Sequence, residues 1–322
     1  MAMDFDWPMA LGSFLVAIVV GLTGMGGGAL MTPMLVTFFG VSPLAAVSSD
    51  LAASAVMKPV GSAVHYRAGT VDLRLVGWLC LGSVPAAFCG VLIPRALGDG
   101  EDVHDFIKLA MGAALLVAAT GILVRAVLSR RARPSEADDG PDGTGRVTVR
   151  PVPTVIVGAV GGLVVGITSV GSGSLIIVAL LLLYPALKPN HLVGTDLLQA
   201  VPLVFAAALG HLFFGEFRME VTAALLVGSI PGVYLGSKIS SRAPAGLIRR
   251  LLVLVLVASA LNMFGVGVVP LAWTIAAIAV AATATWLVGR RKRDTVPSEL
   301  PEEAGESGKR SARGRSMAAR DR

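Results

Sequence analysis

The chain has 322 residues, of which 54% are hydrophobic and 15% are charged, and its mean hydropathy is +0.76. A soluble globular domain carries about 25% charged residues, so the composition excludes that class and predicts an all-α polytopic membrane protein. The formal net charge of +6 does not indicate nucleic-acid binding, because much of the basic excess lies beside apolar runs and in the C-terminal tail, where membrane topology accounts for it.

Apolar runs of membrane-spanning length recur along the chain. They cover about 9–39, 44–64, 75–94, 106–128, 152–187, 192–214, 221–236, 247–268 and 270–288. Together with the charged stretches between them, the runs divide the chain into five predicted parts. These are a first membrane repeat at 1–128, a charged cytoplasmic linker at 129–151, a second membrane repeat at 152–268, an extra C-terminal helix at 269–289 and a disordered basic tail at 290–322.

Glycine is concentrated inside the two longest runs, at 21–30 (Gly-Leu-Thr-Gly-Met-Gly-Gly-Gly-Ala-Leu) and at 166–175 (Gly-Ile-Thr-Ser-Val-Gly-Ser-Gly-Ser-Leu). Each glycine costs a helix roughly 1 kcal/mol relative to alanine. Two interpretations follow. The glycines allow helices to pack closely, or they break the helix so that backbone N–H groups and half-helix ends face a ligand. The second interpretation gains weight because the feature occurs twice, at matching positions.

The two halves match each other residue by residue, which indicates an internal duplication. Asp50 corresponds to Asp196 and His65 to His211, both at a separation of 146 positions (196 − 50). The other pairs at this separation are Pro43 with Pro189, Gly69 with Gly215, Ser83 with Ser229, Pro85 with Pro231 and Gly90 with Gly236. The glycine clusters align at a separation of 145 positions (171 − 26), so the second half has one extra residue between its glycine cluster and its aspartate.

Positive charges predict the orientation of the runs. The basic residues at 290–293 place the C-terminus in the cytoplasm, and counting back through the runs places the N-terminus outside. The run 152–187 must then begin and end on the cytoplasmic side. Its length of about 35 residues would cover roughly 50 Å, against about 30 Å of hydrocarbon. A re-entrant hairpin broken at 171–173 satisfies both length and direction.

The first half runs in the opposite direction, so we predict two inverted-topology repeats. Each repeat has a glycine-broken re-entrant segment and three membrane helices, and one extra helix follows the second repeat. The chain then has seven full crossings and two hairpins. If the hairpins are single tilted spans, there are nine crossings and the ends stay on the same sides.

A small oxyanion is the ligand that suits these breaks. Inverted pairs of broken helices meet near the bilayer midplane, and N–H groups at a half-helix N-terminus favour an anion. Hydroxyl side chains beside the glycines add donors. The candidate substrate-binding residues are Thr23, Gly24, Gly26, Gly27 and Gly28 in the first cluster and Thr168, Ser169, Gly171, Ser172 and Gly173 in the second.

Two aspartates are the first candidates for coupling transport to another ion. Asp50 and Asp196 each lie near the start of an apolar run, after Ser49 and Thr195. One interpretation is a carboxylate near the interface that the helix dipole favours. The other is a proton or cation site inside the membrane, where an ionisable residue is costly and usually functional.

Lys58 and the paired histidines are the remaining coupling candidates. Lys58 lies in the middle of the run 44–64, and Val204 stands at the equivalent place of the second half. It either extends to the inner interface or supplies the counter-charge for an anion. His65 and His211 lie at helix ends, where they either cap the helix near the interface or relay protons.

Three features of the sequence resemble the TauE/SafE sulfite exporter family over about residues 9–268. They are the paired glycine-rich breaks, the Ser/Thr-Asp-Leu motifs Ser49-Asp50-Leu51 and Thr195-Asp196-Leu197, and the motifs Gly82-Ser83-Val84-Pro85 and Gly228-Ser229-Ile230-Pro231. The resemblance implies a transporter that moves small sulfur-containing anions, such as sulfite or organosulfonates, across the cytoplasmic membrane. The long acidic linker and the basic tail depart from the family pattern.

We therefore predict a secondary transporter of small sulfur-containing anions in the cell membrane, and not an enzyme. Its expected partners are a small anionic substrate and the lipid bilayer, with protons as one candidate for the coupling ion; no nucleic acid, cofactor or metal is expected. The only cysteines, Cys80 and Cys89, have no metal-binding spacing. The alternatives are an anion channel, or a membrane-embedded enzyme that would use Asp50, His65 and Ser48 or Ser49. The sequence leaves the substrate, the direction of transport, the coupling ion and the oligomeric state open.

Overall fold

The computed structural model describes residues 6–23, 27–98, 100–131, 148–185, 187, 189–240 and 245–266. In these ranges the chain forms ten α-helices and no strand, which confirms the all-α class. The predicted C-terminal helix, the tail and most of the linker lie outside the described residues.

The helices of the first half are α1 (Trp7–Thr23), α2 (Gly28–Phe38), α3 (Pro43–Arg67), α4 (Leu73–Ala96) and α5 (Glu101–Arg131). Those of the second half are α6 (Pro151–Thr168), α7 (Leu175–Leu183), α8 (Pro189–Phe214), α9 (Met219–Ser240) and α10 (Ala245–Met263). Each of the two longest apolar runs is thus two helices, and the interruption falls in the glycine-rich cluster. Five of the described helices are long and apolar enough to cross a membrane.

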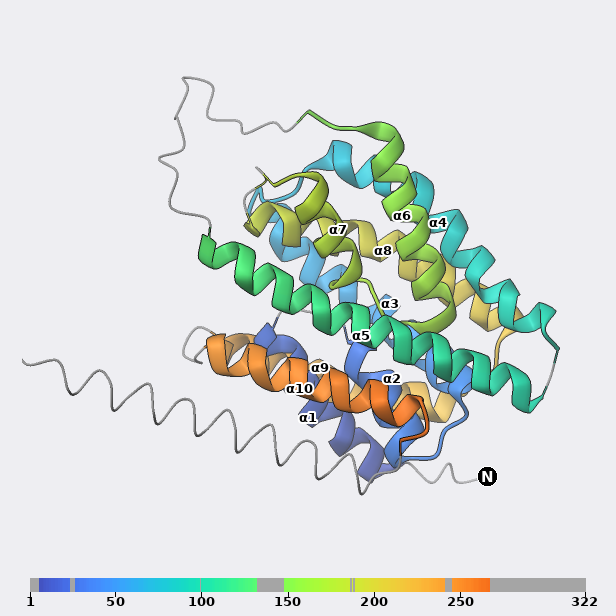
Figure 1. The fold of residues 1–322 in the computed structure, drawn as a ribbon. Coiled ribbons are helices and arrows are strands. Elements are labelled where there is room, and N and C mark those ends of the chain that lie inside the picture. The colour runs from blue at the N-terminus through green and yellow to red at the C-terminus, as the bar shows by residue number, and fades with distance from the viewer. Residues whose placement is uncertain are drawn as a thin grey trace, which may run out of the picture. The chain divides into compact units, whose positions relative to one another are not determined.

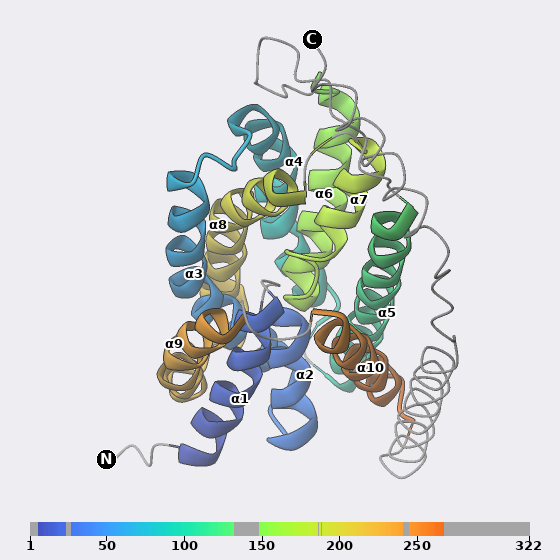
Figure 2. The same cartoon turned by 90° about the vertical axis from the view of Figure 1, so that its left-hand side faces the viewer.

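The two broken runs enter from opposite ends of the helical unit. In Figure 2, α1 and α2 lie in the lower part and α6 and α7 in the upper part, and the ends at which each pair is interrupted point toward the middle. Figure 1 shows the same separation from a second direction. The described residues at the interruptions, Gly27 and Gly28 in the first run and 169–174 in the second, are buried, so backbone groups freed there from helical bonding can find partners inside the protein.

Each broken run packs against a continuous helix of the other half: α1 lies along α9, and α6 lies along α4. On α9, Gly228, Gly232 and Gly236 recur every four residues, and a Cβ placed on Gly228 would lie 2.0 Å from the carbonyl oxygen of Ala10. On α4, a Cβ on Gly82 would lie 2.1 Å from the carbonyl oxygen of Val155. Glycine at these places lets the helix backbones touch, as is common between membrane helices.

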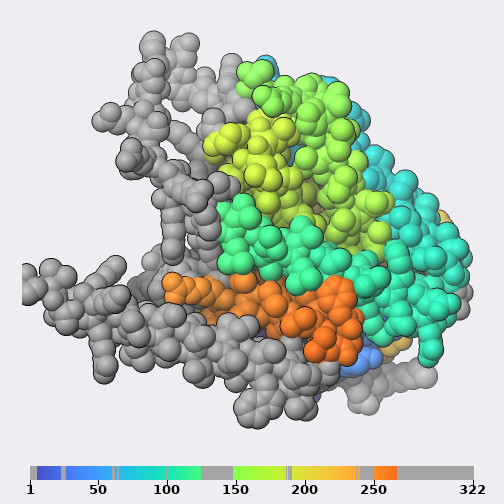
Figure 3. Space-filling view, in the orientation of Figure 1, coloured from blue at the N-terminus to red at the C-terminus, as the bar shows by residue number. Residues whose placement is uncertain are grey.

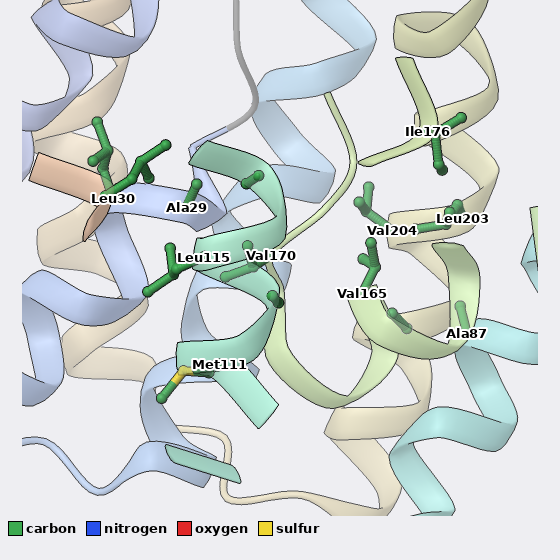
Figure 4. Close-up of a cluster of buried hydrophobic side chains, with 14 of the residues drawn as sticks. Ala29, Leu30, Ala87, Met111, Leu115, Val165, Val170, Ile176, Leu203 and Val204 are labelled. Atoms are coloured by element: carbon green, nitrogen blue, oxygen red, sulfur yellow. The ribbon is translucent and has the colours of Figure 1, made fainter. Parts of the chain in front are cut away.

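The helices α5 and α10 pack against each other and cover one face, where the space-filling view shows them side by side in green and orange (Figure 3). Figure 4 shows what α5 covers: Leu115 lies beside Ala29 and Leu30, at the start of α2, and beside Val170, in the second break, and Met111 follows along α5 in the same apolar cluster. This apolar layer covers the start of α2 and Val170 of the second break.

The backbone contact between α4 and α6 gives a test of the packing. We expect Gly82→Ala to destabilise the purified protein by about 1–3 kcal/mol, because the new methyl group overlaps the α6 backbone. Gly77→Ala is the matched control, since a Cβ at Gly77 on the same helix has no atom within 4 Å. Thermal unfolding in detergent measures both variants. Equal unfolding temperatures for the two would contradict this packing.

Candidate functional site

The second break runs from Ser169 to Ser174 and is buried along its whole length. Its backbone has positive φ angles at Ser169 (59°), Gly171 (125°) and Gly173 (103°). Glycine reaches such angles without a steric penalty, so the two glycines allow the chain to reverse here. Ser172 and Ser174 are 7% and 5% exposed, and Ser174 does not cap α7 with its side chain. The first N–H groups of α7 therefore receive no side-chain cap.

The first break joins α1 to α2. Of its predicted ligand-binding residues, Gly24, Gly26 and the side chain of Thr23 lie outside the described residues. Gly27 and Gly28 are buried at the start of α2, and α2 has no side-chain cap. A Cβ on Gly28 would lie 2.0 Å from the carbonyl oxygen of Ser169. The two breaks, which come from different halves of the chain, thus touch backbone to backbone.

Asp50 connects three segments at this contact. Its Oδ2 accepts hydrogen bonds from Ser169 Oγ in the second break (2.6 Å) and from Thr32 Oγ1 in α2 (2.9 Å). The side chain is completely buried in the second turn of α3. The carboxylate therefore lies inside the protein and beyond the first turn of α3, which disfavours the interpretation as a carboxylate stabilised at a helix start.

Asp196 occupies the matching place on α8 and is 1% exposed. It accepts the backbone N–H of Gly173 and a long hydrogen bond from Gln199 Nε2 (3.4 Å). Gln199 is held in turn by Ser83 Oγ of α4, which donates to Gln199 Oε1 at 3.1 Å. Asp196, like Asp50, lies beyond the first turn of its helix, and both aspartates meet the second break.

Lys58 lies in the same cluster, which we call the centre: Asp50, Asp196, Lys58 and the serines of the second break that they contact. Its Nζ donates a hydrogen bond to Ser172 Oγ in the second break, and its charge interacts with both Asp196 and Asp50. The alternative in which Lys58 extends to the inner interface is wrong, because the side chain turns inward. Val204, its counterpart, is buried in the apolar core. One lysine therefore stands between two carboxylates.

The two histidines have different surroundings. His65 is half-buried at the end of α3, where Nδ1 lies 3.1 Å from Thr70 Oγ1. His211 is 1% exposed, with Nδ1 2.9 Å from Ser48 Oγ and Nε2 2.8 Å from the carbonyl oxygen of Gly166. Capping near the interface fits His65 but not His211, which holds the last turn of α6 from inside the protein. Among the described residues, the two imidazoles face Thr70, Ser48 and the Gly166 carbonyl rather than an aspartate.

Thr168 has a structural role at the end of α6. Its Oγ1 donates to the carbonyl oxygen of Val164 (2.6 Å) and accepts the N–H of Val170 (3.1 Å), so the hydroxyl closes the helix rather than facing the centre. Reasoning from the sequence missed Thr32 and Gln199, which hold the aspartates. A signal existed for Gln199, since it lies three residues after Asp196 in an otherwise apolar helix segment.

Three buried polar side-chain atoms among the described residues have no hydrogen-bond partner: Asp50 Oδ1, Asp196 Oδ2 and Ser229 Oγ. Two of the three belong to the aspartates at the breaks. A buried polar atom without a partner is costly, so a native structure with such an atom calls for an explanation such as a ligand. No group of three metal-ligating side chains occurs in the part of the chain that the structure describes.

The fold and this centre define a multi-pass membrane transporter, and the sequence comparisons agree. The model of the sulfite exporter TauE/SafE family matches residues 9–263, so the chain belongs to that family. It is 39% identical over 228 residues to the probable membrane transporter protein YjnA of Bacillus subtilis, covering 70% of this chain and 87% of the relative. It is 26% identical over 236 residues to the probable membrane transporter protein YdhB of the same organism, covering 72% and 89%. No solved structure matches.

The contact between the breaks can be tested with neighbouring glycines. We expect Gly28→Ala to destabilise the protein, by 1–3 kcal/mol or more, because its methyl group would overlap the Ser169 carbonyl. Gly27→Ala serves as the control, since a Cβ there has its nearest contact at 3.6 Å, with Met31 Cγ. Thermal unfolding of both variants in detergent distinguishes them. A Gly28→Ala variant as stable as Gly27→Ala would show that the breaks do not touch.

Proposed function

We propose that the protein is a secondary transporter of small sulfur-containing anions, such as sulfite or organosulfonates, across the cytoplasmic membrane. The observation that carries the proposal is the meeting of two broken helices around Lys58 and the serines of the second break. The N-termini of α2 and α7 add the partial positive charge of uncapped half-helices. Sulfite and sulfonates present oxygens that such donors bind.

The anion would bind where the breaks meet. In the second break, Ser172 and Gly173 lie beside Lys58 and Asp196, and Ser169 lies beside Asp50. In the first, we assign backbone N–H groups around Gly27 and Gly28, which the contact with Ser169 brings close. Asp50 and Asp196 are the proposed coupling pair, because their charges lie beside the place where the anion would bind.

The architecture that we propose is a pair of inverted repeats. Its support is that corresponding residues make corresponding contacts: Gly82 approaches Val155 as Gly228 approaches Ala10, at separations of 146 (228 − 82) and 145 (155 − 10) positions. In transporters with such repeats, the substrate site lies at the interface between the repeats near the bilayer midplane.

An enzyme is the weaker alternative, because its candidate residues are not assembled. Asp50 bonds Thr32 and Ser169, His65 faces Thr70, and Ser48 pairs with His211. A nucleophile needs a base within hydrogen-bond reach and a third group that orients the base. In the described part of the chain, Ser48 meets His211 rather than His65, and the second nitrogen of His211 faces a backbone carbonyl rather than Asp50, so the predicted set does not come together.

Flux of labelled sulfite into proteoliposomes tests the function. We expect saturable uptake that empty liposomes lack, and we expect Lys58→Met to raise the sulfite KM by about 10- to 100-fold, since a hydrogen bond to a charged group contributes about 1.5–3 kcal/mol. Lys108→Met is the matched control, because Lys108 pairs only with Asp105 on the exposed face of α5.

Three results would contradict this function. Absence of sulfite flux in the wild type would rule out a transporter of sulfite. Flux that never saturates would indicate a channel. A Lys58→Met variant with the KM of Lys108→Met would exclude Lys58 from the site. A thermal-shift screen with sulfite, thiosulfate, sulfoacetate, taurine and lactate ranks the substrates independently of flux.

The orientation that we propose has the N-terminus outside and the C-terminus in the cytoplasm. The test replaces Cys80 and Cys89 by alanine and then introduces Ala2→Cys or Ser316→Cys. We expect an impermeant thiol reagent, applied to intact cells, to label the cysteine at position 2 and to leave that at position 316 unlabelled until the cells are opened. Labelling of both positions from the same side would exclude the inverted arrangement.

A further inference from the structure

The charges at the centre do not balance. Asp50, Asp196 and Lys58 interact there, and together they carry one net negative charge when all three are ionised. The elements around them add no further charge: α2, α6, α7 and the second break have no ionisable side chain in the described residues. An anion that binds beside Lys58 would leave the centre with at least two excess negative charges in a medium of low dielectric constant.

The other titratable groups on the packed helices face elsewhere. His211 of α8 contacts Ser48 and the Gly166 carbonyl, and His65 of α3 contacts Thr70. The Cys80 thiol of α4 faces the backbone carbonyl of Gln199. The remaining charged groups of α3, α4, α8 and α9 are near helix ends: Arg67, Arg74, Arg95, His191, Glu220 and Lys238. Only the two aspartates can change the charge at the centre without removing the ammonium that would bind the anion.

Each aspartate also has one oxygen without a partner. The hydrogen bonds to Asp50 all go to Oδ2, which leaves Oδ1 unpaired, and Asp196 Oδ2 is unpaired as well. Both oxygens are buried acceptors. A fully deprotonated oxyanion has only acceptors and cannot supply either of them with a donor. A proton on one of the carboxyl groups changes this, because the group then has an O–H that can donate to an oxygen of the anion.

We propose that one proton, held by the Asp50–Asp196 pair, occupies the site together with the anion and crosses the membrane with it in the same direction. This inference rests on the proposed function. The proton removes one of the two excess charges, and it converts an unpaired acceptor into a donor for the anion. Either carboxyl group can hold it, since both interact with the charge of Lys58.

Cotransport and exchange make opposite demands on this centre. In exchange, the anion must drive the proton away, which would bring an anion and two carboxylates together beside a single lysine. In cotransport, anion and proton raise each other's affinity, and linkage requires the effect to be reciprocal. Lower pH therefore strengthens anion binding. The charge balance at the centre favours the second scheme.

The test measures how much charge crosses the membrane with each sulfite in proteoliposomes. The concentration gradient of labelled sulfite and the pH are fixed, and the membrane potential at which the net sulfite flux reverses gives this charge. We expect Asp50→Asn and Asp196→Asn, which cannot release a proton from that side chain, to move one more negative charge per sulfite than the wild type. Comparison at one pH cancels the titration of sulfite itself. Asp105→Asn, an exposed carboxylate on α5, is the control and should match the wild type.

The same charge per sulfite in the wild type and in both asparagine variants would overturn the proposal, and so would more negative charge per sulfite in the wild type, which indicates exchange. If neither variant transports sulfite, the proposal is tested instead by the sulfite affinity of the wild type and the variants, measured in detergent at two pH values. A rise of one pH unit should weaken wild-type binding by up to about tenfold more than it weakens binding to the variants. Equal pH dependence contradicts the proposal. Absence of wild-type flux would instead contradict the transport function.

Discussion

The arrangement of the centre depends on the hydrogen bonds that the buried carboxylate of Asp50 accepts. A carboxylate away from water needs donors, and this one takes them from Thr32 in α2 and from Ser169 in the second break. One continuous helix, α3, thereby holds both broken runs. The approach of Gly28 to the Ser169 carbonyl lies at the same place, because Ser169 is the residue that Asp50 positions. The break of the second half is thus fixed by residues of the first.

The duplication supplies two aspartates, but their surroundings have diverged. Asp50 is held by two hydroxyl groups, whereas Asp196 is held by the Gly173 N–H and the Gln199 amide. Lys58 has Val204 as its counterpart. A strictly symmetric centre would have two lysines or none. With one lysine, the centre offers a single positive charge to a ligand and keeps two carboxyl groups that can balance it.

Most of the fold was predictable from the sequence, because the membrane imposes strong patterns. Apolar runs gave the helices, and the glycine clusters gave the positions of both interruptions. The partial symmetry of the sequence pointed to Asp50 and Asp196 as a pair, although their depth remained open. These features depend on local sequence or on its repetition, so they could be derived without a structure.

The contacts of the centre could not be derived in this way. The direction in which Lys58 points depends on the position of Ser172, which is 114 residues away in the chain. For His211 the sequence left two roles open, a cap near the interface or a proton relay, because its position at the end of α8 is visible in the sequence and the neighbouring Gly166 carbonyl is not. Thr32 looks like an ordinary residue of an apolar helix until Asp50 is placed beside it. Long-range pairing of this kind is decided by tertiary packing.

The most direct test of a site between the two breaks is a crystal structure with selenite, an oxyanion close to sulfite whose selenium can be located by anomalous scattering. We expect one strong anomalous peak beside the start of α2, at a position that brings selenite oxygens within hydrogen-bond reach of Lys58 Nζ and Ser172 Oγ. A peak elsewhere in the protein, in a preparation that transports sulfite, would contradict it.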